Sequence, residues 1–198
     1  MADKKEIQEQ RIRKYFMDAA KETLKGEGLR AVNVRAIAER AGYSYATLYN
    51  YFKDLNELIF LCVQDFTTEC ETFVNDETIQ LPAGKERLKA RVQAYVDYFI
   101  QYPGIFELIF LESMRNLGNK EVIAQHIYTF MDHICQADLD VLKAEGKLND
   151  IEAANMLAIL KNATTGLLLF YNNRMQPSNY KTFMEISLKQ IDTMVKSI

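Results

Sequence analysis

The sequence predicts an all-α protein, and three observations support this prediction. Proline and glycine are scarce, with 3 and 8 in 198 residues, so long segments run without a helix breaker. Within these segments apolar residues recur at spacings of three and four, the period of an amphipathic helix. Sustained alternation and Asn-Gly or Asp-Gly hairpin turns, which mark strands, are absent from the sequence. Hydrophobic residues make up 48% of the chain, enough for a substantial core.

The first two expected helices lie before residue 42. An apolar stripe through Phe16 and Leu24 predicts a helix that ends at Gly26, since glycine commonly terminates helices. Asn33 is a residue type that caps helix N-termini, and the apolar spacing after it covers about two turns. Gly42 then ends this second, short helix.

A third short helix and a long fourth helix follow. Ser44 is expected to cap the third helix, which turns Leu48 and Phe52 inward. Asp54 and Glu57 form a capping-box-like start for the fourth helix, which we expect to run toward residue 73. Three short helices therefore precede one long helix.

Beyond residue 82 the pattern predicts five further helices, with a break at Tyr102-Pro103-Gly104 because proline cannot continue a helix. Their expected ranges are 85–101, 105–117, 120–144, 150–173 and 178 to near the end of the chain. No stretch is long enough to serve as a linker between separate domains. We expect two regions with one fused core.

Charge divides the chain near residue 55. Residues 1–55 carry eleven Lys or Arg against eight Asp or Glu, whereas the rest of the chain carries thirteen against nineteen. A basic module that approaches a polyanion, attached to an acidic body, would produce this division. An ordinary fluctuation of surface charge would produce it too. We place the expected domains at residues 1–55 and 56–198.

Several classes of protein are excluded by what the sequence lacks. Apolar runs fall short of the about 20 residues that cross a bilayer, and the N-terminus is too polar for a signal peptide, so we expect a cytoplasmic protein without a membrane partner. The three cysteines are odd in number and lack CxxC spacing, which predicts buried core thiols rather than disulfides. We find no convincing acid–base, nucleophile or metal constellation, so we expect no cofactor and no enzyme activity.

Residues 34–52 have the dimensions of a helix-turn-helix, with two short helices joined by a tight turn that contains Gly42. The second helix of this motif lies in the DNA major groove, so it must be apolar on one side and rich in hydrogen-bonding groups on the other. Here the outer side and its end carry Ser44, Tyr45, Thr47, Tyr49, Asn50, Tyr51 and Lys53. The pattern therefore predicts binding to double-stranded DNA.

The same segment resembles the TetR family of bacterial transcriptional regulators. The residues that carry the resemblance are Ile37-Ala38, Ala41-Gly42, Ser44, Thr47-Leu48-Tyr49, Tyr51-Phe52 and Asn56-Glu57-Leu58. The resemblance implies an all-helical homodimer with an N-terminal helix-turn-helix and a larger helical-bundle region for ligand binding and dimerisation. It further implies a repressor that a small molecule releases from a palindromic operator.

By that resemblance, individual residues have expected roles on DNA. Tyr49, Tyr51 and Lys53 would contact the DNA backbone, and Tyr45 and Thr47 would meet base edges. Arg35 matches a position that reads guanine in some members, and arginine bonds bidentately to guanine. The alternative for Arg35 is an ordinary solvated side chain.

Aromatic and Met residues beyond residue 82 are candidates for an effector pocket, because such pockets are mostly apolar and Met adapts to varied shapes. The candidates are Phe106, Ile109, Phe110, Met114, Tyr128, Met131 and Phe170. A solid core is the alternative for each. His126 and His133 lie seven residues apart, and the sequence leaves open whether either lines the pocket.

The last two helices are expected to form the homodimer. Ala163, Thr165 and Gly166 offer a small surface where two helices can approach closely. The last helix carries a mostly apolar stripe of Tyr180, Phe183, Ser187, Ile191 and Met194, and an exposed stripe of this kind needs a partner. The alternative is that the stripe packs within one chain. For the whole protein, the rival function is a helical-bundle enzyme or small-molecule carrier that does not bind DNA.

Overall fold

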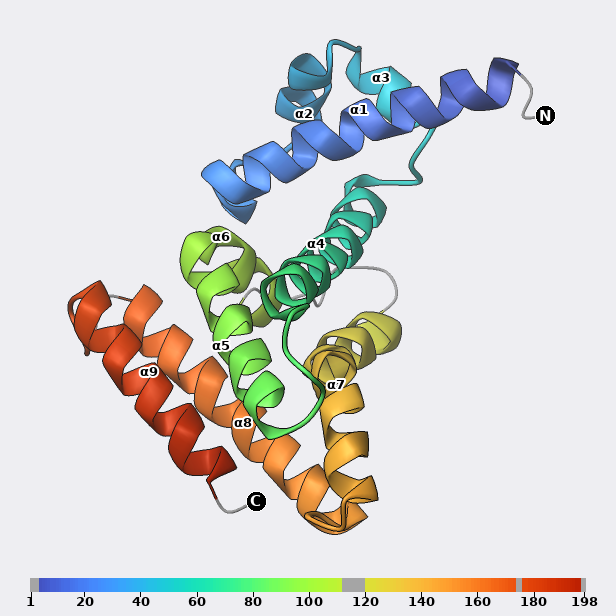
Figure 1. Cartoon of the computed structure of the whole chain (residues 1–198). Helices are drawn as coiled ribbons and strands as arrows, with labels where there is room; N and C mark the ends of the chain where they lie inside the picture. Colours follow the sequence, from blue (N-terminus) through green and yellow to red (C-terminus); the bar gives the residue numbers. More distant parts are fainter. Residues whose placement is uncertain (1–3, 112–119, 174–175, 197–198) are drawn as a thin grey trace. The chain divides into compact units, whose positions relative to one another are not determined.

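The computed structural model describes residues 4–111, 120–173 and 176–196, and every regular element in these ranges is helical (Figure 1). The expected all-α class is therefore confirmed. The elements are α1 (Lys4–Gly26), η1 (Leu29–Ala31), α2 (Val34–Ala41), α3 (Tyr45–Leu48), α4 (Leu55–Thr78), α5 (Lys85–Gln101), α6 (Pro103–Phe106), the π-helical η2 (Glu107–Leu111), α7 (Lys120–Ala144), α8 (Asp150–Asn172) and α9 (Tyr180–Val195). The helix α4 continues five residues beyond the expected end at residue 73.

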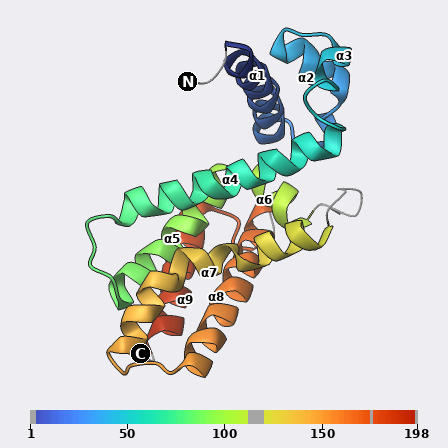
Figure 2. The ribbon, with the colours of Figure 1, turned by 90° about the vertical axis from the view of Figure 1, so that its right-hand side faces the viewer.

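Contacts between residues group the chain into two units. The first unit comprises Met1–Thr67 and Tyr102–Gln125, and the second comprises Thr68–Gln101 and His126–Ile198. The helix α4, which is one continuous helix in Figure 2, contributes to both units. The boundaries of these units differ from those of the expected domains, residues 1–55 and 56–198. That residues 1–55 bind DNA stays a prediction.

The core of the first unit forms where α1 packs against α2 and α2 packs against α3 (Figure 2). Phe16 of α1 and Leu48 of α3 are completely buried, and Phe52 is 2% exposed. The ring centroids of Phe16 and Phe52 lie 6.2 Å apart, edge to face, which is a favourable aromatic arrangement. The inward positions of Leu48 and Phe52, expected from helical spacing, are confirmed.

A close approach of α6 to α1 brings residues after Tyr102 into the first unit. A Cβ atom on Gly104 would lie 2.9 Å from the Leu24 carbonyl oxygen, which is too close for a normal contact. Glycine, which has no Cβ atom, therefore permits this approach. The expected helix at 105–117 starts earlier, because Pro103 occupies the first helical position, where its missing N–H costs nothing. Its turns widen into the π-helical η2 after Phe106.

In the second unit α9 packs against α5 and α8 (Figure 1). The stripe expected to face a partner subunit faces its own chain instead, since Phe183 and Ser187 are completely buried and Ile191 is 2% exposed. The Ser187 hydroxyl donates a hydrogen bond to Gln93 Oε1 of α5 at 3.1 Å, so the one polar residue of the stripe is satisfied inside the unit. The centre of the stripe is therefore closed to a partner subunit, and the expectation that these buried residues form the dimer contact is wrong, whereas Tyr180 at its start is exposed.

The helix α8 is long and apolar enough, by length and composition alone, to cross a bilayer, although its uninterrupted apolar runs are short. A core helix meets the same criterion, and here α8 packs against α5 and α9. Cys62, Cys70 and Cys135 are buried free thiols, as expected. Burial raises the pKa of the Cys135 thiol to about 12, which leaves it protonated and unreactive at neutral pH.

Candidate nucleic-acid interface

The turn between α2 and α3 is built by local hydrogen bonds that the sequence predicts. The Asn33 side chain accepts a hydrogen bond from the Ala36 backbone N–H at 2.9 Å, which caps α2. Gly42 ends α2 in the left-handed conformation, with φ of 79°, which glycine adopts without steric cost. Ser44 then caps α3 by accepting from the Thr47 N–H at 3.2 Å. Both predicted caps are confirmed.

The outer side of the α2–α3 pair carries exposed polar groups. Tyr45 is 58% exposed and Tyr49 is 51% exposed, large fractions for aromatic side chains. Arg35, Asn50 and Lys53 are also exposed. Because Leu48 and Phe52 point into the core, the segment has the two-sided character that a helix needs to enter a groove.

Three of the expected contact residues are partly engaged within the protein. The hydroxyls of Ser44 and Thr47 lie 2.9 Å apart and share a hydrogen bond, and Thr47 is half-buried. Tyr51 is half-buried too, with its ring centroid 6.4 Å from that of Phe16. These contacts hold the side chains at defined positions before any ligand arrives, which reduces the conformational entropy lost on binding.

Helix α1 contributes a residue that sequence reasoning missed. The Arg13 guanidinium donates a hydrogen bond from Nη1 to the Tyr51 carbonyl oxygen and lies 4.6 Å from the centroid of the Phe52 ring. Its position three residues before Phe16 places it beside the apolar stripe of α1, and this is the only hint of the contact in the sequence. No local pattern reveals a bond across 38 positions.

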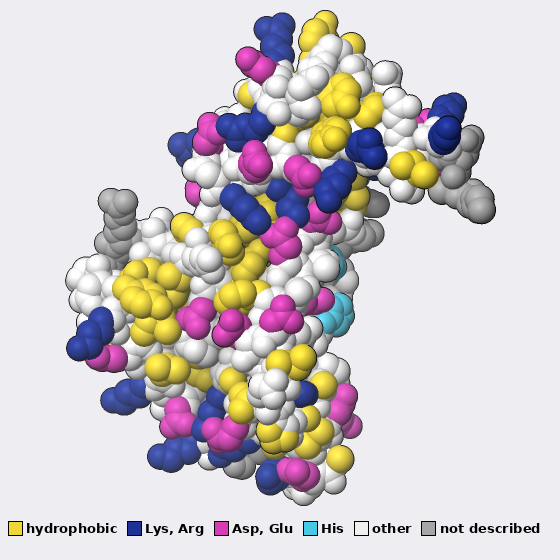
Figure 3. All heavy atoms as spheres, turned by 45° about the horizontal axis from the view of Figure 1, so that its top comes forward, with side chains coloured by type: hydrophobic (Ala, Val, Ile, Leu, Met, Phe, Trp, Pro, Cys, Tyr) yellow, Lys and Arg dark blue, Asp and Glu magenta, His cyan; other side chains and the backbone are white. Residues whose placement is uncertain are grey.

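A second arginine ties α2 to α1. Arg40 donates from Nη1 to the Thr23 hydroxyl at 3.0 Å and from Nη2 to Glu27 Oε1 at 2.8 Å. In Figure 3 the Lys and Arg side chains of the N-terminal helices, at the top of the view, lie among acidic side chains instead of forming one continuous patch. On this face the N-terminal helices therefore present a mixture of basic and acidic side chains.

The residues expected to line an effector pocket fall in different parts of the structure. Phe106, Ile109 and Phe110 belong to the first unit, where the rings of Phe106 and Phe110 lie 5.0 Å apart. In the second unit Met131 is buried, whereas Tyr128 is 65% exposed and Phe170 is 52% exposed. Met114 lies outside the described residues. The expected pocket stays a prediction.

One groove of the second unit has a volume of about 540 Å³ and lies among α4, α5 and α9. Its polar lining includes Glu77, Asp97 and Lys89, and Lys89 Nζ is paired with Asp192 at 2.6 Å. Burial raises the pKa of the Asp97 carboxyl above its ordinary value, and the nearby Glu77 carboxylate adds to the rise. The groove thus combines several carboxylates with apolar side chains, and its lining includes none of the residues expected to form the effector pocket.

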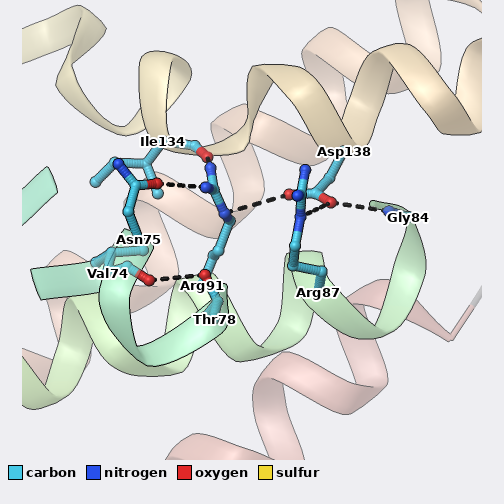
Figure 4. Close-up of polar contacts among 8 residues, drawn as sticks. All are labelled: Val74, Asn75, Thr78, Gly84, Arg87, Arg91, Ile134 and Asp138. Atoms are coloured by element: carbon cyan, nitrogen blue, oxygen red, sulfur yellow. Dashed lines mark hydrogen bonds and ion pairs between the residues drawn. The ribbon is translucent and has the colours of Figure 1, made fainter. Parts of the chain in front are cut away.

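A buried polar network connects α4, α5 and α7 in the second unit (Figure 4). The Asp138 side chain of α7, completely buried, accepts hydrogen bonds from Gly84 N and Arg87 Nε, both at 2.8 Å. Its second oxygen lies 3.6 Å from Arg91 Nε. The Arg91 guanidinium also donates to the Asn75 side chain of α4 and to the carbonyl of Ile134 in α7. Arg91 therefore links the distal part of α4 to α7 within the second unit.

Within the described ranges, no group of three or more His, Cys, Asp and Glu residues is arranged to hold a metal ion. His133 is 62% exposed, and its Nδ1 lies 4.0 Å from Glu71 Oε1. That exposure makes His133 a surface residue and not part of an enclosed pocket.

A capped helix, a left-handed glycine turn and a second helix with an exposed polar side define a protein of the helix-turn-helix class. Residues 16–61 match the family model described as bacterial regulatory proteins, tetR family. The match covers the helix-turn-helix segment, which is therefore of the TetR family.

Named relatives match parts of the chain. The chain is 32% identical over 85 residues to the HTH-type transcriptional regulator BetI of Escherichia coli O17:K52:H18, a match that spans 43% of each protein. Over a longer stretch it is 22% identical to an uncharacterized HTH-type transcriptional regulator of Haemophilus influenzae, covering 69% of this chain and 67% of that one.

Solved structures share the fold along nearly the whole chain. FadR from Bacillus subtilis, in complex with stearoyl-CoA, matches with a TM-score of 0.73 and 15% identity over 93% of this chain and 98% of that chain. GusR of Salmonella enterica matches with a TM-score of 0.68 and 17% identity over 93% and 95%. At these identities the likeness concerns the fold.

Proposed function

We propose that the chain is a dimeric repressor of transcription that binds a palindromic DNA operator and is released by a small, largely apolar molecule. In this proposal residues 1–55 hold the DNA-binding surface, and the protein acts in the cytoplasm without catalytic activity. The observation that carries the proposal is the exposed polar side of α3, set by two caps and the Gly42 turn. The family match of this segment supports the same assignment.

The chemistry of the surface suits duplex DNA. Tyrosine hydroxyls and a lysine ammonium donate to phosphate oxygens, which position a protein on the duplex without reading sequence. Arg35, exposed on α2, has the fork of donors that matches guanine. We assign Tyr49, Tyr51 and Lys53 to the backbone and Tyr45, Thr47 and Arg35 to base edges.

Selection of bound duplexes from a random DNA library by the full-length protein tests this proposal. The expected result is enrichment of two inverted half-sites whose centres are about one helical turn or a multiple of it apart. Arg35→Ala should relax the preference at particular base pairs, whereas Tyr49→Phe should weaken binding about equally on all sequences. Failure of the protein to retain any duplex at low salt would remove the proposal.

A homodimer through α8 and α9 remains part of the proposal, with a face that excludes the buried centre of the stripe at Phe183, Ser187 and Ile191. Ile151, Ile159 and Phe170 are exposed on one side of α8, and Tyr180 and Leu188 are exposed on α9. Figure 3 shows hydrophobic side chains gathered over this helix pair, on the left of the view. Apolar side chains grouped in this way are typical of an interface.

Gly166 supports close approach of a second copy at this face. Helical geometry places it in the same arc of α8 as Ile159 and Phe170. A Cβ atom there would meet nothing within 4 Å among the described residues of its own chain. Gly166→Arg should therefore convert a dimer into a monomer in sedimentation at micromolar concentration, whereas Ala154→Arg, exposed on another side of α8, should leave the dimer intact. A wild-type monomer would contradict the dimer.

The proposed effector binds the second unit and acts through α4. This helix is continuous from Leu55 to Thr78, and Arg91 binds its distal part at Asn75. A ligand that favours another position of α4 would change the separation of two recognition helices in a dimer. Linkage then requires DNA to weaken ligand binding by the same factor. Control of about 10–100-fold corresponds to about 1.4–2.7 kcal/mol.

Thermal-shift screening of apolar compounds, and separately of amphipathic acyl-CoA thioesters such as the stearoyl-CoA bound by FadR from Bacillus subtilis, identifies candidates. Each stabilising compound is then added to a titration of the selected operator. A fall in operator affinity supports induction. Compounds that stabilise the second unit but never change operator affinity would leave only a constitutive DNA-binding protein.

A further inference from the structure

Just after α3, the hydrogen bonds of the helix leave the Tyr51 backbone carbonyl without a donor from its own helix. α3 ends at Leu48, and the last helical-type bonds run from the N–H groups of Tyr51 and Phe52 to the Leu48 carbonyl. The carbonyl of Tyr51 lies beyond these bonds, and such terminal carbonyls need donors from elsewhere. The donor here is Arg13, reached from α1.

Arg13 holds two consecutive residues at once. Its Nη1 donates to the Tyr51 carbonyl, and its Cζ lies 4.6 Å from the Phe52 ring centroid. A guanidinium over an aromatic face is attracted to the ring, and a hydrogen bond from a charged donor is stronger than a neutral one. The Tyr51 ring packs near Phe16, which is three residues from Arg13 on the same helix. One face of α1 therefore fixes both the backbone and the ring of Tyr51.

We propose that Arg13 is a positioning residue for DNA binding, which sets the place of the Tyr51 hydroxyl and does not itself contact DNA. The inference rests on the proposed function, because it deepens the account of the same surface. The opposite interpretation is that Arg13, as one of several basic residues in α1, binds a phosphate directly. The two interpretations differ in their salt dependence, since only a residue that neutralises a phosphate contributes to counterion release.

The test measures affinity of the full-length protein for a duplex selected by the wild type, over a range of salt concentrations. Arg13→Met removes both contacts and should lower affinity about tenfold with an unchanged log–log salt slope. Arg13→Gln keeps an N–H donor for the carbonyl and should recover part of the loss. Lys14→Met, a neighbouring exposed position, is the matched control for removal of one positive charge.

A direct phosphate contact would reduce the slope by about 0.9 in Arg13→Met and Arg13→Gln alike, with no recovery by Gln, and would overturn the inference. A double-mutant cycle measures the coupling between Arg13 and the Tyr51 hydroxyl, which a general loss of stability does not change. If Arg13 acts through the Tyr51 hydroxyl, Arg13→Met should cost much less affinity in a Tyr51→Phe background. Equal losses in both backgrounds would also overturn it.

Circular dichroism at the assay temperature establishes whether each variant is folded. If Arg13→Met does not fold, the affinity and salt slope of Arg13→Gln are used instead. Failure of the inference is distinct from failure of the proposed function. If the wild type binds no duplex, the function is wrong. If the wild type binds and Arg13→Met binds equally well, the function stands and the positioning role is wrong.

Discussion

Asp138 is the residue whose removal should destabilise the second unit most clearly. Its carboxylate is completely buried and accepts hydrogen bonds from Gly84 N and Arg87 Nε, both at 2.8 Å. Asp138→Ala leaves the buried Gly84 N–H without this acceptor and leaves the Arg87 guanidinium, 19% exposed, without its carboxylate. Arg91 keeps its bonds to Asn75 and Ile134, so its loss is smaller.

These contacts determine the free energy of unfolding that Asp138→Ala is expected to lose. Removing one partner of a buried ion pair costs about 3–5 kcal/mol, and the partial exposure of Arg87 favours the lower end of that range. For a chain of this size, a loss of about 3 kcal/mol lowers the midpoint of thermal unfolding by about 6–12 °C. Asp138→Asn keeps one acceptor oxygen for Gly84 and should fall between Ala and the wild type.

Thermal unfolding followed by circular dichroism measures the effect, with a urea titration as a second measure of the free energy of unfolding. Asp140→Ala is the control, because Asp140 lies on the same helix but is exposed in its pair with Lys143. We expect this control to unfold close to the wild-type midpoint. If Asp138→Ala unfolds at the same temperature as Asp140→Ala, the buried network does not stabilise the unit as argued.

Three further changes test other parts of the structure. Asp97→Asn should raise the urea midpoint at pH 7, because burial raises the pKa of Asp97 and so penalises its ionised form. The gain should vanish below pH 3.8, where the carboxyl is protonated in the folded and unfolded states alike. A gain in stability that persists below pH 3.8 would contradict this reasoning. Gly104→Ala should lower the thermal midpoint of the protein, because the new methyl would meet the Leu24 carbonyl at 2.9 Å; an unchanged midpoint would show that α6 shifts freely. Ser44→Ala removes the cap of α3 and should cost about 1 kcal/mol in urea unfolding, with Ser44→Gly closer to the wild type.

Features set by neighbouring residues were predictable from the sequence. The caps at Asn33 and Ser44 depend on a side chain three positions before the N–H that it binds, and Gly42 supplies a left-handed turn at its own position. The inward placement of Leu48 and Phe52 follows from helical periodicity. Most of the helix-turn-helix could therefore be found without coordinates. The expectation that the first helix is short was wrong, because α1 has 23 residues and is nearly as long as α4, which has 24.

Features set by distant contacts were not predictable. The stripe on α9 is apolar whether it faces a partner or its own chain, and only the packing of Phe183 and Ile191 shows that it faces inward. Arg13 meets Tyr51 across 38 positions, and Arg87 meets Asp138 across 51. Charged residues at such separations look like solvated surface in a sequence, because nothing local distinguishes a buried arginine from an exposed one.

Binding of duplex DNA by the exposed side of α3 is tested most directly by the double variant Tyr45→Ala, Tyr49→Ala. Both side chains are more than half exposed, so their truncation should leave thermal unfolding close to that of the wild type. Fluorescence anisotropy with a labelled duplex selected by the wild type measures the affinity of both proteins under the same salt. The folded double variant should lose most of its affinity for this duplex. A folded double variant that binds the duplex as tightly as the wild type would contradict binding by this side of α3.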